Sequence, residues 1–91
     1  MMSYFLLGAL DVSPAAQKLL GRVPMDLIAR HAIHDHGNVT KAEVADNLKG
    51  ADEGGRILSR YRADPTDPKS KSVLVVTHEG WAKTTITLDR K

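Results

Sequence analysis

The chain has 91 residues, of which 42% are hydrophobic and 26% are charged. This length and balance predict one globular domain over residues 1–91 and exclude a disordered chain. The absence of cysteine excludes disulfide scaffolds, zinc-thiolate sites and thiol catalysis, and it favours the reducing cytoplasm. The apolar run over residues 4–10 is interrupted by Gly8 and has no basic flank, so we expect neither a signal peptide nor a membrane span.

The net charge of +2 is distributed unevenly along the chain. Residues 1–53 carry five Lys or Arg against seven Asp or Glu, whereas residues 54–91 carry eight against four. A basic C-terminal half suits an acidic partner, nucleic acid included, although such an excess is also common on solvated surfaces.

Local signals in the first half of the chain predict two short helices before residue 37. Ser13 followed by Pro14 is typical of a helix N-terminus, and the apolar residues behind it predict a helix over residues 14–20. A second helix is predicted to begin at Pro24 and to continue to about His36, since apolar side chains recur there at helical spacing.

A third helix is predicted after Thr40. Thr40 and Glu43 have the spacing of a capping box, in which each side chain bonds a free backbone N–H group of the other residue. This helix should end before Gly54, a residue that readily adopts the left-handed conformation found after helices. Its apolar stripe, expected to face the core, consists of Val44, Leu48 and Ala51.

Three strands are predicted in the second half of the chain. Residues 56–62 alternate as a half-exposed strand does, residues 72–78 are mostly β-branched and apolar, and residues 83–89 form a third strand. Short connections favour an antiparallel meander. The sequence therefore predicts an α+β fold in which three short N-terminal helices pack on a three-stranded antiparallel β-meander, with a core of Leu27, Ile28, Val44, Leu48, Ile57, Leu74, Val76 and Ile86.

Several short motifs follow one another in a fixed order along nearly the whole chain. They begin with Leu7-Gly8 and Ser13-Pro14-Ala15, include Arg30-His31, and end with Thr84-Thr85-Ile86. This order resembles a family of small plasmid-related proteins encoded on bacterial plasmids and integrative elements, some of which are labelled as restriction-modification subunits. The polar residues shared with the family pattern are His31, Asp35, Asn47, Arg56, Ser59, Tyr61, Thr77, Thr84 and Thr85.

The chain departs from the family pattern at several positions. His34 and His36 replace Gly and Trp, His78 replaces Glu, and Gly80-Trp81 replaces an Asp-Arg pair. A family site built on that Asp-Arg pair would be missing from this chain. The resemblance implies a mobile-element setting and a shared fold, and it implies no reaction, substrate or cofactor.

Histidine and carboxylate side chains are densest near the end of the second predicted helix. On a helix, His31, His34 and Asp35 share one face, where imidazole and carboxylate groups suit zinc. A stable site needs a further ligand, and the helix end turns His36 away from this face. We therefore expect no bound metal ion and no cofactor. His31 should be partly buried and hydrogen bonded, Asp35 should accept from backbone donors, and His34 and His36 should be exposed.

Hydroxyl side chains gather on the predicted strands. Ser59 beside His31 could act as a nucleophile with its base, but the sequence contains neither a nucleophile elbow nor a recognisable oxyanion-hole motif. Threonine is common in strands because its branched Cβ packs well on a pleated surface. We therefore assign no catalytic residue.

Basic side chains gather on the first predicted strand. Arg56, Arg60 and Arg62 share one strand face and could contact phosphate groups, while Tyr61 or Trp81 could stack on bases. No helix-turn-helix, RNP or KH motif accompanies them. Trp81 lies in a predicted turn, where it is either a lid on the core or an exposed contact for a protein partner.

These observations rank three functions. The leading hypothesis is a non-enzymatic accessory protein of a mobile genetic element that binds a host or element macromolecule in the cytoplasm, without membrane association. A protein partner is favoured, and interference with a host defence system is one concrete version. The first alternative is a nucleic-acid-binding module that uses the basic C-terminal sheet. The second is a small metal-dependent enzyme that uses His31, His34 and Asp35. The oligomeric state stays open.

Overall fold

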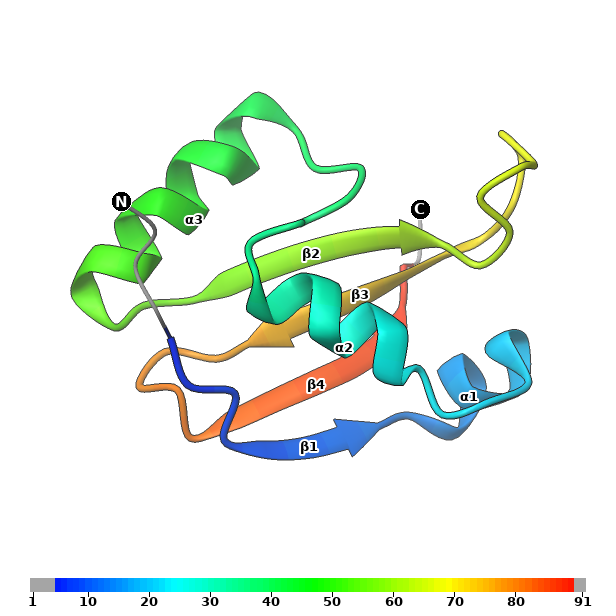
Figure 1. The fold of residues 1–91 in the computed structure, drawn as a ribbon, viewed down its shortest axis with the longest axis horizontal. Helices are drawn as coiled ribbons and strands as arrows, with labels where there is room; N and C mark the ends of the chain where they lie inside the picture. The colour runs from blue at the N-terminus through cyan, green and yellow to red at the C-terminus, as the bar shows by residue number, and fades with distance from the viewer. Residues whose placement is uncertain (1–4, 90–91) are drawn as a thin grey trace.

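The computed structural model describes residues 5–89 and shows an α+β fold. In chain order its helices and strands are β1 (Ala9–Val12), α1 (Pro14–Leu20), α2 (Met25–Ala32), α3 (Lys41–Glu53), β2 (Ile57–Arg62), β3 (Ser72–Thr77) and β4 (Lys83–Leu88) (Figure 1). The three helices and the last three strands confirm the sequence prediction, whereas β1 is an addition to it.

The sheet is mixed and has the strand order β1-β4-β3-β2 (Figure 1). β2, β3 and β4 form the expected antiparallel meander. β1 precedes the helices and pairs in parallel with β4, so the prediction of a three-stranded sheet is wrong. The local sequence gives little indication of strand β1, because this strand has only four residues and three of them are exposed. Its pairing depends on the tertiary fold, which brings the start of the chain beside its last strand.

The expected caps set the ends of α1 and α3. Ser13 Oγ accepts a hydrogen bond from the Ala16 N–H group at 3.1 Å at the start of α1. At the start of α3, Thr40 Oγ1 accepts from the Glu43 N–H group, and the Glu43 carboxylate accepts from the Thr40 N–H group. These reciprocal bonds confirm the capping box and fix the position at which α3 begins.

α2 ends at Ala32, so the prediction that this helix continues to about His36 is wrong. His34 adopts a left-handed conformation with φ 64°, which a helix does not contain. The segment behind it runs along β2 instead, with His36 O accepting from Arg60 N–H at 3.0 Å and Asn38 N–H donating to Arg60 O at 2.8 Å. Backbone groups that a longer helix would use internally are therefore bonded to the sheet.

The main core lies between the sheet and the helices α1 and α2. α2 lies across one face of the sheet, and α1 lies beside the β1 and β4 side (Figure 1). The buried side chains of this core are Ala16, Leu27, Ile28, Tyr61, Val73, Val75 and Ile86. Of the expected core residues, Leu27, Ile28, Ile57, Val76 and Ile86 are buried.

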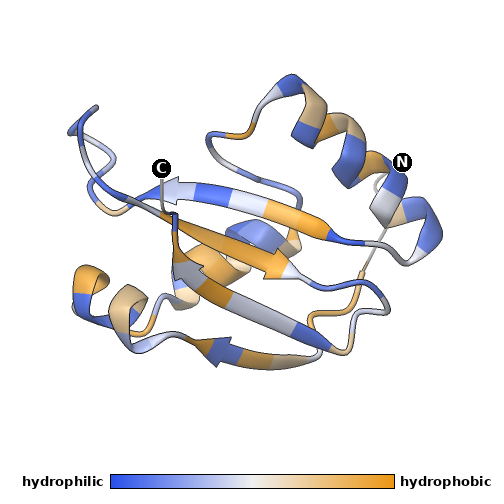
Figure 2. Cartoon of the chain, turned by 180° about the vertical axis from the view of Figure 1, so that it is seen from behind, coloured by the Kyte–Doolittle hydropathy of each residue, from blue (hydrophilic) through white to orange (hydrophobic). Residues whose placement is uncertain are grey.

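Three expected core residues are not buried. Leu74 is half-buried, because Val73 and Val75 are the β3 side chains in the main core and successive side chains of a strand alternate between its two faces. The face of the sheet opposite α2 is turned toward the viewer in Figure 2. Val44 and Leu48 of α3 are 45% and 66% exposed, so their predicted place in the core is wrong. α3 lies along β2 at the edge of the sheet and buries Asn47 and Gly50 there, which turns the apolar stripe outward.

The helices of the described part of the chain are short. Within residues 5–89, none combines the length and the apolar composition that crossing a bilayer requires.

Candidate functional site

His31 and three hydroxyl groups of the sheet form a buried cluster. The Nδ1 atom of His31 lies 2.5 Å from Ser59 Oγ, and its Nε2 atom lies 2.9 Å from Thr77 Oγ1. Thr77 Oγ1 lies 2.7 Å from Thr84 Oγ1, which donates to the carbonyl oxygen of Leu7 at 2.6 Å. The four side chains are fully buried. Four of the residues shared with the family pattern thus meet in one place.

The bond from Thr84 to a carbonyl oxygen determines the direction of the other hydrogen bonds. The Thr84 hydroxyl donates its only proton to the Leu7 carbonyl oxygen, so its oxygen atom accepts the hydrogen bond from the Thr77 hydroxyl. Thr77 has then used its own proton and must accept from the Nε2–H group of His31. A neutral imidazole carries one N–H group, so the Nδ1 atom of His31 is the acceptor for the hydroxyl of Ser59.

The hydrogen-bonded chain continues to the surface through two more histidines. Ser59 Oγ has given its proton to His31, so it accepts from the Nδ1–H group of His36 at 2.7 Å. The Nε2 atom of His36 is then the acceptor for His34 Nδ1, 3.4 Å away. His34 and His36 are half-buried rather than exposed as expected, and both line a surface groove. The chain of bonds runs from this groove to the Leu7 carbonyl group.

The surroundings of His31 keep its imidazole neutral in the folded chain. Burial, and then the neighbouring charges of His36 and His34, lower the pKa of His31 to about 3. Burial also lowers the pKa of His36. Ser59 beside His31 resembles a nucleophile with its base, but the serine is fully buried and the imidazole is a weak base. The geometry therefore gives a closed network that holds α2 on the sheet.

The set His31, His34 and Asp35 does not share a helix face. Only His31 lies within α2, and its ring points into the sheet, with both nitrogen atoms in hydrogen bonds. The Asp35 carboxylate accepts from the backbone N–H group of Gly37, as expected, and it also pairs with the Arg30 guanidinium at 2.7 and 3.2 Å. Among the described residues, no group of three or more His, Cys, Asp or Glu side chains could hold a metal ion.

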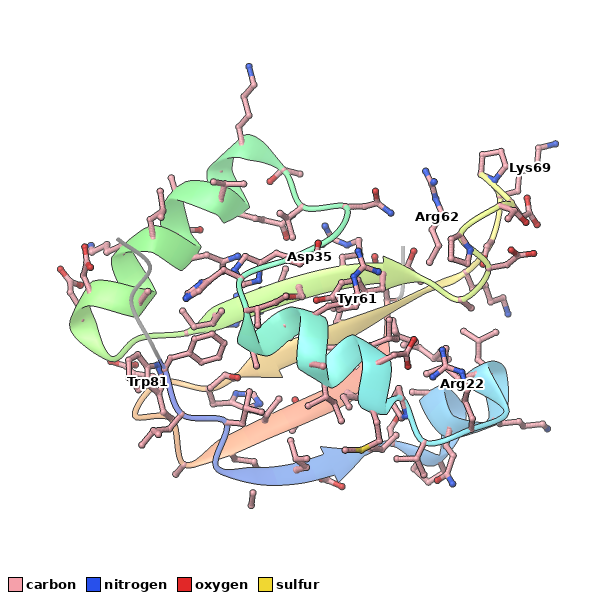
Figure 3. The ribbon with its side chains drawn as sticks, in the orientation of Figure 1. Arg22, Asp35, Tyr61, Arg62, Lys69 and Trp81 are labelled. Atoms are coloured by element: carbon pink, nitrogen blue, oxygen red, sulfur yellow. The ribbon has the colours of Figure 1, made fainter. Side chains whose placement is uncertain are left out.

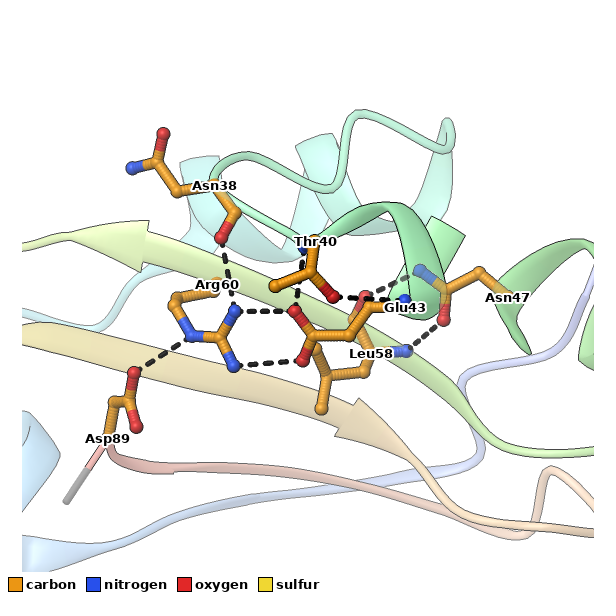
Figure 4. Close-up of polar contacts among 7 residues, drawn as sticks. All are labelled: Asn38, Thr40, Glu43, Asn47, Leu58, Arg60 and Asp89. Carbon is orange, nitrogen blue, oxygen red and sulfur yellow. Dashed lines mark hydrogen bonds and ion pairs between the residues drawn. The ribbon is translucent and has the colours of Figure 1, made fainter. Parts of the chain in front are cut away.

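Arg60 lies at the centre of an ion-pair cluster that joins three elements (Figure 4). Its two Nη atoms bond the two carboxylate oxygens of Glu43 at 2.7 and 2.9 Å, and its Nε atom bonds Asp89 at 2.8 Å. The Arg60 side chain is 13% exposed. Its hydrogen bonds lower the pKa of Glu43 to about 2. Arg60 thus has its donors committed within the molecule and presents little surface to a phosphate group.

The other members of the expected basic surface lie apart from one another. Arg56 is exposed and lines a groove that also contains Glu43, Glu53 and Glu79. Arg62 lies at the opposite end of β2, near the loop that carries Lys69 (Figure 3). The Tyr61 ring is 2% exposed, its hydroxyl donates to the Asp35 carbonyl oxygen, and burial raises its pKa to about 12. Tyr61 therefore offers no open face for base stacking.

Trp81 packs on its own domain. Its Nε1–H group donates to the Gly55 carbonyl oxygen at 2.8 Å, and its ring lies edge-on to Phe5 with 6.0 Å between ring centres. The side chain is half-buried, and it lies far from Arg62 and Lys69 (Figure 3). Of the two interpretations made from the sequence, these contacts favour the lid on the core.

Asn47 has a structural role that the sequence interpretation missed. Its side-chain amide donates to the Leu58 carbonyl oxygen at 2.7 Å and accepts from the Leu58 N–H group at 2.8 Å (Figure 4). The amide thus replaces a strand on the free edge of β2. Thr85, another residue of the family pattern, bonds His78 at 3.0 Å. A buried-face asparagine one turn after a capping box could have signalled this arrangement.

The outward side of α3 forms one wall of a groove that the sequence interpretation also missed. The groove has a volume of about 560 Å³ and lies between α3 and the segment of residues 34–39. Val44, Leu48 and Ala51 line it from α3, and His34 and His36 line it from the opposite side. The sequence does contain a signal for this orientation of α3. Asn47 and Gly50 form a second stripe that is suited to close packing, and when this stripe is buried the apolar stripe faces outward.

Comparison of the chain with family models, with curated proteins and with solved structures finds no significant match.

Proposed function

We propose that this chain is a non-enzymatic accessory protein of a mobile genetic element, and that it binds a protein partner through the groove beside α3. The observation that carries the proposal is the outward apolar stripe of α3. Val44 and Leu48 are 45% and 66% exposed, and they line a groove large enough for the side chains of a partner segment. Apolar side chains grouped along one helix face are typical of surfaces that bind proteins.

The opposite side of α3 holds the helix firmly on the sheet. Asn47 makes two hydrogen bonds to β2, and Glu43 makes two to Arg60. These contacts leave Val44 and Leu48 without a role in the core. A rigidly held helix loses little conformational freedom when a partner binds, which favours affinity.

The mobile-element setting comes from the resemblance of the sequence motifs, and interference with a host defence system is one version of the proposal. A small protein can block such a system by covering a surface of it, without a reaction of its own. The alternatives have less support. The basic side chains are divided between ion pairs and opposite ends of β2, and the proposed metal ligands do not face a common point.

Site-specific photo-crosslinking in a native host tests this proposal. A photoreactive residue at position 48 is expected to capture one host or element protein, whereas the same residue at the exposed position 87, on the other side of the sheet, is not. With the photoreactive residue kept at position 48, Val44→Glu on the same groove wall should abolish the capture, and Thr87→Glu should leave it intact. Circular dichroism controls for folding of each variant.

Two results would count against the proposal. One is equal crosslinking from positions 48 and 87, which indicates contact without a defined surface. The other is capture that nuclease treatment removes, which indicates that the partner is bound through nucleic acid.

A further inference from the structure

The two edges of the sheet differ in how far their outward backbone N–H and C=O groups are hydrogen bonded. On the outer edge of β2, the N–H and C=O groups of Leu58 bond the Asn47 side chain at 2.8 and 2.7 Å. Those of Arg60 bond His36 and Asn38 at 3.0 and 2.8 Å. Edge strands with unpaired backbone groups associate readily with other strands, so this covering protects β2.

The outer edge of β1 has no comparable covering within the described part of the chain. The N–H groups of Ala9 and Ser13 bond β4, at 3.0 Å to Ala82 O and 2.8 Å to Ile86 O. In a parallel ladder, the residues between these bonding positions direct their N–H and C=O groups to the other side. The backbone groups of Leu10 and Val12 therefore face outward, where the sheet order places no further strand.

Apart from its short length, β1 also lacks the features that protect open edges. It contains no proline, lysine or bulge, and the Leu10 side chain is 46% exposed. Its one charged residue, Asp11, has an ion partner on β4, with 3.5 Å between its carboxylate and Lys83 Nζ. Only the short length of β1 thus opposes the addition of a strand.

We propose that β1 is a homodimer interface, in which the β1 strands of two copies pair antiparallel across a twofold axis and join two four-stranded sheets. A second copy fits because the edge is self-complementary. With Leu10 on the axis, its outward N–H and C=O groups bond those of its own counterpart, and the two leucine side chains meet on the same face. Asp11 then lies opposite Ala9 of the other copy.

The charge of Asp11 selects this register. Placing Asp11 on the axis would set two carboxylates directly opposite each other on one face, which destabilises an antiparallel pair. Because β1 has four residues, the shared edge is short, and the dimer is expected to be weak and concentration-dependent. This inference is independent of the groove beside α3, because α3 lies beside β2 at the other edge of the sheet (Figure 1).

Analytical ultracentrifugation over a range of concentrations tests the interface. The wild-type chain is expected to pass from monomer to dimer as its concentration approaches about 1 mM, the range of weak association. Leu10→Pro removes an outward N–H group without touching the bonds to β4, and proline is tolerated at such positions, so this variant should stay monomeric. Leu10→Lys should do the same. Leu6→Lys, which changes a leucine that is 70% exposed and outside β1, should still dimerise.

Disulfide trapping tests the register, because the chain has no cysteine of its own. The proposed pairing sets the two copies of residue 10 about 5.5 Å apart between Cα atoms, within the range of a disulfide. The two copies of residue 11 lie about 8 Å apart, beyond that range. Leu10→Cys should therefore form a covalent dimer under mild oxidation, and Asp11→Cys should not.

A wild-type chain that stays monomeric throughout overturns the proposal. So does a dimer that survives both Leu10→Pro and Leu10→Lys. Preferential trapping of Asp11→Cys would place the axis elsewhere and overturn the register.

Discussion

At the scale of single residues, His31 makes the stability of the fold depend on pH. The fold lowers the pKa of this imidazole to about 3 from the ordinary value of 6.5, chiefly through burial. In the unfolded chain His31 takes up a proton below about pH 6.5, while the folded chain keeps it neutral until about pH 3. The unfolded state binds more protons between these values, so stability is present above this window and falls as the pH falls through it.

We predict that lowering the pH from about 7.5 to about 5 reduces the free energy of unfolding by about 2 kcal/mol through His31 alone, at about 1.4 kcal/mol for each pH unit below the unfolded pKa. The depressed pKa of His36 acts in the same direction. Urea unfolding at the two pH values measures the difference. Most carboxyl groups titrate below this range, so they contribute little to it.

Two variants and one titration control this prediction. His31→Gln should weaken the pH dependence, whereas His78→Gln, at an exposed histidine, should leave it unchanged. In the wild-type chain, the NMR signals of the His31 ring should not move between about pH 7.5 and about pH 5. A midpoint near the ordinary histidine pKa would show that the imidazole is accessible to protons in the folded state.

Asn47 gives a second prediction at this scale. Asn47→Ala leaves the buried N–H and C=O groups of Leu58 without their partners, at a cost of about 2 to 4 kcal/mol in the free energy of unfolding. Asn38→Ala is the matched control, because the Asn38 side chain is exposed and the residue's bonds to Arg60 come from its backbone. It should change stability by no more than about 0.5 kcal/mol. Equal losses from both substitutions would refute the role given to the Asn47 amide.

At the scale of elements, α3 shows which features the sequence predicts and which it does not. Its ends follow from local chemistry, and both the capping box and the stop at Gly54 are observed. Its orientation does not follow, because hydrophobic periodicity marks Val44 and Leu48 as the side to bury. The close approach of Gly50 and the hydrogen bonds of Asn47 decide the orientation instead, and these contacts are non-local.

The same distinction explains the other differences at this scale. Helix α1 and the meander of β2, β3 and β4 are predictable, because the sequence signals for them lie within neighbouring residues. β1 and the early end of α2 are not, since β1 gains its bonds from β4 and residues 36–38 gain theirs from Arg60. The candidate groove could not be predicted from the sequence for the same reason. One of its walls is a helix whose apolar stripe faces outward, and the other is a segment that was expected to be helical.

Gly50 provides the prediction at this scale. Replacing glycine by alanine within a helix ordinarily stabilises it by about 1 kcal/mol. At Gly50 a Cβ atom would lie 2.4 Å from the Arg56 carbonyl oxygen, a contact that forces α3 away from the start of β2. Gly50→Ala should therefore lower the melting temperature, whereas Lys49→Ala, on the exposed side of the same helix, should leave it nearly unchanged. A melting temperature raised by Gly50→Ala would show that α3 is not held this closely.

At the scale of the whole molecule, two of the basic side chains that the sequence places in the C-terminal half, Arg60 and Lys83, form ion pairs in the described part of the chain. Arg60 is neutralised by Glu43 from the acidic half and by Asp89 from the end of β4. The loop between β2 and β3 carries Lys69 and Lys71 but also Asp64 and Asp67, so its formal charge is zero. Among residues 5–89, the basic side chains of the C-terminal half therefore do not form one continuous basic surface.

Binding to nucleic acid tests this distribution of charge. Contacts from Arg56, Arg62, Lys69 and Lys71 would neutralise at most four phosphates, which sets a limit of about −3.6 on the slope of log affinity against log salt for duplex DNA. Because these side chains lie at opposite ends of β2, we predict a shallower slope and a dissociation constant no tighter than about 10⁻⁵ M near physiological salt. Fluorescence anisotropy with a mixed-sequence oligonucleotide measures both quantities. Submicromolar affinity, lost when Arg56 and Arg62 become Glu but kept in Lys41→Glu on α3, would instead establish the sheet as a nucleic-acid interface.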